Sequence, residues 1–221
     1  SLEMPEKQLL KRMLSSLGNI HSRRMRSPNK LFQESDWHSL SAAMGRLYSY
    51  SLRILDEPGM DLPYIWRYAR KLRQEIGPNR KLLIIIDYLQ LIGSNRSGKE
   101  NRYSEVSEIS RGLKNMARKL NATVLAISQL NRAVESRQNK RPMLSDLRES
   151  GQIEQDADLI ALLYRDDYYN SYSKDGNEIE VIVAKHRNGP IGTVKLGFRK
   201  EYGQFVAVGS GGACHHPLFV E

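Results

Sequence analysis

One carboxylate, Asp87, stands at the end of the apolar run KLLIIID (81–87). A strand end is a rigid mount, so an aspartate there is suited to hold Mg²⁺ beside a nucleotide through a water, because a hard cation needs an anionic oxygen. The same residue could instead cap the turn that follows the strand. The pattern leaves both interpretations of Asp87 open, a metal-site carboxylate and a turn cap.

A glycine-containing loop follows this strand and imitates a phosphate-binding motif. Residues 93–99 read GSNRSGK, which matches the spacing G-x-x-x-x-G-K between a strand and a helix. Glu100, however, stands where the motif needs Ser or Thr, and its carboxylate would repel phosphate. One strand also cannot readily supply both the metal-site Asp87 and the phosphate loop, since these come from different strands. We therefore expect a flexible basic loop here, with a phosphate loop as the minor alternative.

The residues before Asp87 predict helices. Apolar side chains recur at helical spacing in three segments, 6–17, 36–48 and 61–76. Asp36 and Asp61 are the first residues of the second and third segments and are predicted N-caps. Gly77 and the proline after it predict the end of the third helix.

The strand at 81–87 begins a predicted β-α-β unit. Its continuous β-branched character predicts a strand buried on both faces, as in a parallel sheet. A long helix follows, and its apolar stripe consists of Val106, Ile109, Leu113, Met116, Ala117 and Leu120. TVLAIS (123–128) is predicted as the second buried strand, which completes the unit.

The C-terminal part predicts further strands. DLIALLY (158–164) is a third apolar run, and antiparallel strands are predicted at 179–185, 193–198 and 204–208, with a turn at Asn188-Gly189-Pro190. Residues 131–157 are polar and lack periodicity, which favours a long functional loop. The fold class is α/β, and ligands on such sheets bind at the carboxyl ends of the strands.

Composition narrows the class of protein. The 221 residues suffice for one substantial domain, and the formal net charge of +9 suits a polyanionic partner such as nucleic acid. The lone Cys214 cannot form an internal disulfide, and no apolar run of membrane-spanning length is present. We therefore expect a cytoplasmic protein without a membrane partner. The chain starts at Ser1 rather than Met, so we expect that it has been processed or truncated, or that residues before Ser1 are not included.

Several stretches together resemble the motor of the DnaB-type hexameric replicative DNA helicases. In order they are SLEM, LLIIIDYLQLI, ISRGLKNMARKL, AISQLNRAVESR, KRPMLSDLRESGQIEQDADLI and AKHRNGPIGTVKL. The resemblance covers residues 1–208, and RESG-x-IEQDAD followed by KHRNGP distinguishes these helicases from other RecA-like ATPases such as recombinases. It implies a RecA-like P-loop NTPase core with a mostly parallel central sheet flanked by helices, a C-terminal antiparallel extension, and a flexible tail at 209–221.

The resemblance also implies roles at the nucleotide. Glu3 of SLEM would polarise the attacking water, Asp87 would hold Mg²⁺ through a water, and Gln129 would sense the γ-phosphate of ATP. Arg187 would be an arginine finger with Lys185 as its companion, both reaching a neighbouring subunit's nucleotide. Plainer interpretations stay open. Glu3 could be a surface residue at a helix start, and Gln129 could simply hydrogen-bond main-chain groups of its loop. The two cations could belong to a solvated basic hairpin that binds nothing.

Single-stranded DNA is the implied polymer. Arg148, Glu149 and Gly151 match the family loop that grips the DNA backbone, so little base specificity is expected. Further basic residues upstream could widen the DNA path or be merely solvated, namely Arg132, Arg137, Lys140 and Arg141.

The family places its phosphate-binding loop before the SLEM segment, and its collar domain earlier still, so we expect both to lie upstream of this sequence. The implied function is a replicative helicase motor, a homo-hexamer that couples ATP hydrolysis to translocation on single-stranded DNA within a nucleoid-associated replisome, with primase and a helicase loader as partners. A fragment that acts only in DNA binding or assembly, without ATPase activity, is the alternative.

Overall fold

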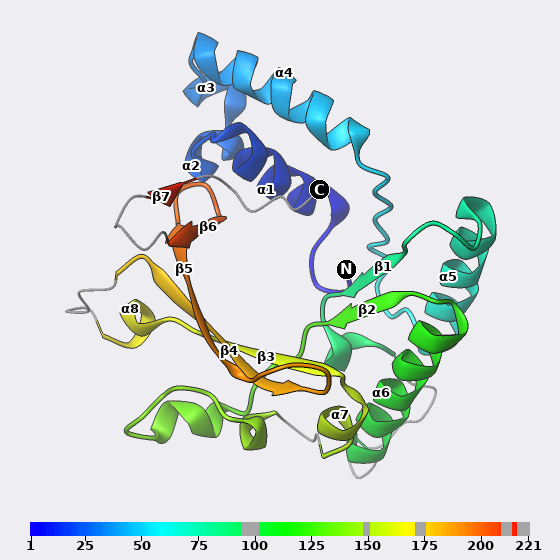
Figure 1. The fold of residues 1–221 in the computed structure, drawn as a ribbon. Helices are drawn as coiled ribbons and strands as arrows, with labels where there is room; N and C mark the ends of the chain where they lie inside the picture. Colours follow the sequence, from blue (N-terminus) through cyan, green and yellow to red (C-terminus); the bar gives the residue numbers. More distant parts are fainter. Residues whose placement is uncertain (94–101, 148–150, 171–175, 209–213, 216–221) are drawn as a thin grey trace. The chain divides into compact units, whose positions relative to one another are not determined.

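The computed structural model (Figure 1) describes residues 1–93, 102–147, 151–170, 176–208 and 214–215. The chain divides into two units. Unit 1 comprises Ser1–Pro5, Leu55–Ile160 and Ala184–Pro190, and unit 2 comprises Glu6–Ile54, Ala161–Val183 and Ile191–Glu221.

The centre of unit 1 is a pair of parallel strands, β1 (Leu83–Ile86) and β2 (Thr123–Ala126). Their register runs from Leu83 opposite Thr123 to Ile86 opposite Ala126. The helix between them, α6 (Arg102–Lys119), makes the connection that parallel pairing requires. The predicted β-α-β unit is therefore confirmed.

One face of this strand pair carries the core of unit 1. Figure 1 shows α5 (Leu62–Ile76) and α6 along the same side of β1 and β2. The buried core residues are Ala69, Ile86, Leu89, Ile92, Val106, Ile109, Leu113, Met116 and Leu120. The stripe predicted for α6 supplies most of them, and burial of such side chains stabilises the unit by about 1.5–3 kcal/mol each.

The opposite face of the strand pair is open. Leu83 and Ile85 of β1 are each 57% exposed, and Leu125 is 49% exposed. The prediction that these strands are buried on both faces was therefore wrong. Side chains alternate between the two faces of a strand, and among the described residues only the face toward α5 and α6 is covered.

Helix boundaries follow local capping chemistry with one exception. Asp61 caps α5 as predicted, because its carboxylate accepts the Tyr64 N–H at 2.8 Å, and Gly77 ends the helix with a φ of +80°. Asp36 is not the N-cap of its helix. Gln33 is the N-cap, and Asp36 accepts the Gln33 N–H at 2.9 Å from the third helical position, as in a capping box. The Asp36 carboxylate is also paired with Arg24.

The polar segment after β2 contains short ordered turns rather than one long irregular loop. The 3₁₀ helices η3 (Arg132–Ser136) and η4 (Leu144–Asp146) are followed by helix α7 (Gly151–Asp156). Arg137, which directly follows η3, forms an ion pair of 2.5 Å with Asp146 of η4. Arg137 is thus bound within its own loop.

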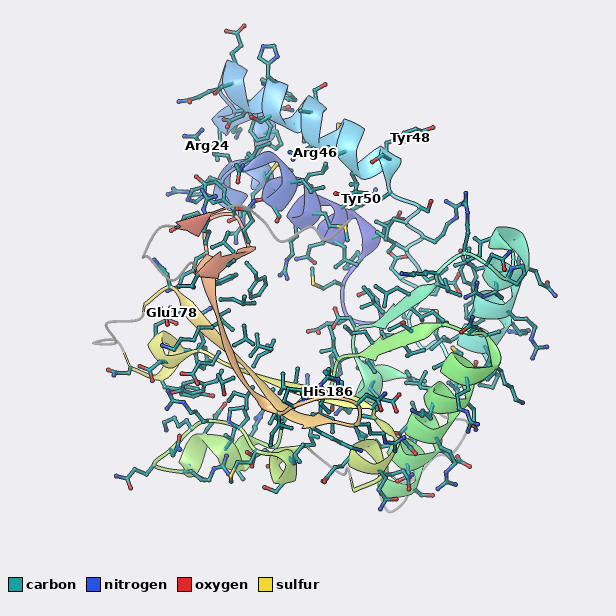
Figure 2. All side chains as sticks on the ribbon, viewed as in Figure 1. Arg24, Arg46, Tyr48, Tyr50, Glu178 and His186 are labelled. Atoms are coloured by element: carbon teal, nitrogen blue, oxygen red, sulfur yellow. The ribbon has the colours of Figure 1, made fainter. Side chains whose placement is uncertain are left out.

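In unit 2, amphipathic helix α1 (Glu6–Gly18) packs against α4 (Glu34–Ser49), with α2 (Ser22–Arg26) and α3 (Pro28–Leu31) between them in the chain. The Arg24 side chain of α2 pairs with Asp36 at 2.9 Å, and Arg46 of α4 donates to the Leu17 carbonyl. Figure 2 shows Tyr48 projecting away from α4, and this side chain is 92% exposed.

A five-stranded sheet runs in the order β3-β4-β5-β6-β7. Its strands are β3 (Leu159–Tyr164), β4 (Glu178–His186), β5 (Gly192–Arg199), β6 (Gln204–Val208) and β7 (Cys214–His215). The pairs β4 with β5, β5 with β6 and β6 with β7 are antiparallel, which confirms the predicted antiparallel extension. Helix α8 (Asp166–Tyr169) follows β3.

The predicted tail at 209–221 lies outside the described residues except for β7. The assignment of residues 1–208 to one motor domain stays a prediction. In the part of the chain that is described, no helix has the length and apolar character to cross a membrane.

Arg73 of α5 ties together the segments around β1 and β2. Its guanidinium donates to the carbonyls of Leu120 at 2.8 Å, Gly77 at 3.0 Å, Arg80 at 2.6 Å and Asn121 at 2.7 Å. These oxygens belong to the end of α5, the approach to β1 and the turn before β2. One side chain therefore satisfies four main-chain acceptors that no strand pairing reaches.

We expect Arg73→Met to lower the free energy of unfolding by about 2 kcal/mol or more, because four acceptors lose a charged donor. Urea denaturation followed by circular dichroism measures this. The control is Lys71→Met on the same helix, where a 75% exposed side chain makes only a 4.0 Å pair with Glu75 and the expected change is below about 0.5 kcal/mol. Equal effects of the two substitutions would show that Arg73 has no special role.

Candidate nucleotide site and finger cluster

Asp87 and Gln129 lie at the same edge of the parallel strand pair. Asp87 follows β1 directly, and main-chain bonds continue beyond both strands: the Ile127 N–H donates to the Ile86 carbonyl, and the Leu89 N–H donates to the Ile127 carbonyl, each at 2.9 Å. Because parallel strands end at one edge, these bonds keep the two segments together. This edge is where ligands bind on such sheets.

Gln90 holds the segment that carries Gln129. It lies in the 3₁₀ helix η1 (Leu89–Leu91), its amide nitrogen donates to the Ser128 hydroxyl at 2.9 Å, and its amide oxygen accepts the Gln129 N–H at 3.3 Å. This residue was not predicted from the sequence. The available signal was a single amide inside the apolar stretch YLQLI directly after the strand aspartate.

Glu3 approaches the same edge from the N-terminal segment. The N–H of the preceding Leu2 donates to the Asp87 carbonyl at 2.7 Å, and the Leu2 side chain packs against the core of unit 1. Glu3 itself is exposed and Asp87 is half-buried. Asp87 therefore has a defined neighbour beyond its own turn, the segment that carries a second carboxylate.

The donors at this edge suit Mg²⁺ beside a polyphosphate. Asp87 and Glu3 offer carboxylate oxygens and Gln129 offers an amide, whereas Mg²⁺ in proteins takes one or two carboxylates and completes its shell with water and phosphate oxygens. Among the described residues there is no group of three or more His, Cys, Asp or Glu side chains arranged to hold a metal. The residues at this edge fit a metal that arrives with a nucleotide.

Lys185 and Arg187 form a second cluster around the end of α7. Arg187 donates from Nη1 to the Asp158 carboxylate at 3.2 Å and from Nη2 to the Gln155 carbonyl at 2.6 Å. Lys185 donates to the carbonyls of Glu154 and Gln155. Cations near a helix C-terminus interact favourably with its unpaired carbonyls. Both predicted finger residues are therefore bound within the chain and do not extend freely.

The turn after β4 requires its glycine. His186, labelled in Figure 2, ends β4, and a Cβ on Gly189 would lie 2.4 Å from the His186 ring. The ring nitrogen Nδ1 lies 3.3 Å from the Pro190 carbonyl. Close packing of the ring over Gly189 thus shapes the turn that presents Arg187.

Three cations, Lys114, Arg187 and Lys185, act on the exposed Asp158 carboxylate. Its carboxylate is 2.5 Å from Lys114 of α6, on the oxygen that Arg187 does not use. The hydrogen bond from Lys114 lowers the pKa of Asp158 below its ordinary value of 3.8, and Arg187 and Lys185 act in the same direction. The carboxylate is therefore ionised through the neutral range and keeps both partners.

Helix α7 connects this cluster to the predicted DNA loop. Gly151 is its first residue, and Asp156 near its end accepts the Ser110 hydroxyl of α6 at 2.8 Å. Arg148 and Glu149 lie outside the described residues, as do residues 94–101 of the loop that imitates a phosphate-binding motif. The carbonyls that Lys185 and Arg187 bind therefore belong to the last turn of the helix that follows the predicted DNA loop.

Comparison with known proteins decides the family. Residues 1–207 match the family described as DnaB-like helicase C terminal domain. The chain belongs to this family. Its sequence is 53% identical over 206 residues to the replicative DNA helicase DnaC of Bacillus subtilis (strain 168) and 54% identical over 206 residues to the replicative DNA helicase DnaB of Geobacillus stearothermophilus. Each match covers 93% of this chain and 44% of the relative, so the chain spans less than half the length of these proteins.

Two solved structures share the fold. One, whose title describes it as an ATPase domain, superposes with a TM-score of 0.89 at 48% identity, covering 94% of this chain and 72% of that one. A second is titled "The Structure Of A DnaB-Like Replicative Helicase And Its Interactions With Primase". It superposes with a TM-score of 0.88 at 48% identity, covering 93% of this chain and 49% of that one. The predicted family and RecA-like fold are confirmed.

We expect Gln90→Leu to speed hydrogen exchange at the Gln129 N–H about fivefold, because a hydrogen bond worth about 1 kcal/mol is lost. Mass spectrometry or NMR at residue resolution measures the rate. The Ile127 N–H, which bonds to the Ile86 carbonyl, is the internal control and keeps its protection. Unchanged exchange at Gln129 would mean that Gln90 does not hold this segment.

We expect the Asp158 carboxyl to titrate below 3.8 in NMR and Lys114→Met to raise its pKa. The contacts of Asp158 stabilise the folded state above its ordinary pKa, and this contribution is lost as the pH falls through the lower folded value. Lys119→Met, on the same helix over the Trp66 ring, is the matched control. A titration that Lys114→Met leaves in place would assign the shift to other groups.

Proposed function

We propose that this chain is the ATP-hydrolysing motor of a ring-shaped replicative helicase that translocates on single-stranded DNA. The observation that carries the proposal is the meeting of Asp87, Gln129 and the Glu3 segment at one edge of the parallel strands. Membership of the DnaB-like helicase C-terminal domain family supports it. The substrate class is ATP, and Mg²⁺ is the metal.

Asp87, Glu3 and Gln129 have separate roles at the nucleotide. Asp87, at the end of β1, would hold Mg²⁺, and the ion would supply positive charge that neutralises the phosphates. Glu3 accepts a proton from the water that attacks the γ-phosphate. This role suits an exposed carboxylate at the carboxyl edge of the parallel strands. Gln129 hydrogen-bonds the γ-phosphate and so distinguishes ATP from ADP.

Arg187 and Lys185 act on the nucleotide of a neighbouring subunit. Charge develops on the transferring phosphoryl group, and a guanidinium delivered in trans stabilises it. A head-to-tail ring of identical subunits supplies such a contact at each interface. We propose a homo-hexamer, in which each ATP lies between one subunit's Glu3 and the next subunit's Arg187.

DNA binds through the loop before α7. Arg148 contacts phosphate, Gly151 allows close approach of the main chain, and Glu149 belongs to the same matched loop. Because phosphate contacts carry no sequence information, binding is independent of sequence and falls with added salt. Primase is a proposed partner, since one similar solved structure is titled for its interactions with primase. A helicase loader is proposed from the family resemblance alone.

Mixed rings test the proposal. Full-length protein with Glu3→Gln and full-length protein with Arg187→Ala should each lose DNA-stimulated ATPase activity by at least about 100-fold. A 1:1 mixture should recover about one quarter of wild-type activity if subunits mix at random, because one interface in four then joins an intact Glu3 to an intact Arg187. Phosphate release with single-stranded DNA measures this.

The control is a mixture of Glu3→Gln with the doubly substituted protein, which contains no complete interface and should stay inactive. Mixtures that co-assemble without recovering activity would contradict the trans role of Arg187. A wild-type ring that binds DNA but hydrolyses no ATP would favour the alternative, a DNA-binding or assembly module without motor activity.

A further inference from the structure

The Arg187 guanidinium is held at two points. Nη1 donates to Oδ1 of Asp158 at 3.2 Å, and Nη2 donates to the Gln155 carbonyl at 2.6 Å. The Arg187 main-chain N–H also donates to the Asp158 carbonyl at 2.8 Å, so backbone and side chain are fixed against the same residue. Two bonds from different nitrogens determine the plane in which the guanidinium lies.

This docking leaves the guanidinium able to bind a further anion. An arginine side chain has five N–H groups, and the two contacts use one on each terminal nitrogen. The side chain is 47% exposed. The remaining N–H groups can therefore reach a phosphate without breaking either anchor, so the docked conformation is compatible with the role proposed for Arg187.

The two anchors are themselves fixed. Oδ2 of Asp158 is 2.5 Å from Lys114 of α6, so the carboxylate is held through the oxygen that Arg187 leaves unused. The Gln155 carbonyl belongs to α7, and this helix is joined to α6 by the bond between Ser110 and Asp156 at 2.8 Å. Both anchors therefore rest on α6, the 18-residue helix of unit 1.

We propose that Asp158 is a positioning residue that orients the Arg187 guanidinium for a neighbouring subunit's nucleotide. The inference rests on the proposed function, because it assigns Arg187 its target in trans. Preorganised cations stabilise a transition state more than mobile ones, since no reorganisation is required when the charge develops. In this role Asp158 acts through Arg187, to which it is bonded.

Three substitutions in the full-length protein separate orientation from stability. Asp158→Ala removes the anchor of Arg187 and the partner of Lys114 together. Asp158→Asn keeps an oxygen that can accept from Arg187 but loses the charge that pairs with Lys114. Lys114→Met removes the same ion pair and leaves the Arg187 contact in place.

We expect Asp158→Ala to lower kcat of the DNA-stimulated ATPase about tenfold, with KM for ATP changed less than about twofold. Asp158→Asn and Lys114→Met loosen the anchor but leave an oxygen that accepts from Arg187, so they should lower kcat by no more than about threefold. ADP with aluminium fluoride, which mimics the transition state, should bind Asp158→Ala about tenfold more weakly, whereas a non-hydrolysable ATP analogue should bind it normally. Thermal unfolding of every variant measures stability separately.

Parallel losses in kcat and thermal stability for all three variants would overturn the inference, because the residue would then serve only the ion pair with Lys114. Wild-type kcat and analogue binding in Asp158→Ala would overturn it as well. The variant Arg187→Ala separates a failure of the role of Asp158 from a failure of the proposed function. If it loses ATPase activity while Asp158→Ala does not, only the role of Asp158 fails, whereas full activity in Arg187→Ala overturns both proposals.

Discussion

The parallel pairing of β1 with β2 is the constraint on which the rest of unit 1 depends. Because the two strands run in the same direction and in register, their carboxyl ends coincide, and Asp87 and the Gln129 segment reach one edge together. The pairing in turn requires a crossover, and α6 provides it while burying its apolar stripe on the same strands. A change of register would separate the strand ends and dismantle the core at once, because each residue shifted moves side chains to the other face.

Three polar side chains secure what the core cannot reach. Arg73 satisfies carbonyls around the turns that enter the strands, Gln90 ties down the segment that leaves β2, and Asp158 gathers Lys114 and Arg187 at the start of β3. Each acts between segments far apart in the sequence and bonds to main-chain groups or charges there. The open face of β1 and β2 has no such arrangement among the described residues, and its leucines and isoleucine remain exposed.

Helix α7 places the two proposed activities next to each other. Its first residue, Gly151, belongs to the predicted DNA loop, and its last carbonyls receive Lys185 and Arg187. Gln155, whose carbonyl accepts from Arg187, lies four residues after Gly151 in this six-residue helix, so the two proposed sites are close in the chain.

The sequence alone determined the local elements and the family: the period of the apolar residues predicted α1, α5, α6 and the strands, Asp61 was recognised as a cap, and the motifs around Asp87 and Arg187 indicated their chemistry. These features depend on neighbours a few residues apart. Only the tertiary structure decided that Gln33 rather than Asp36 begins α4, that one face of β1 stays open, that Gln90 holds Gln129, and that Arg187 docks on Asp158. At α4 the decision is local, because the Asp36 carboxylate accepts the Gln33 N–H from the third helical position, and sequence spacing does not distinguish that position from an N-cap. In the other three cases the deciding partner or covering surface lies far along the chain or is lacking among the described residues. The pattern of apolar residues does not tell which distant groups meet.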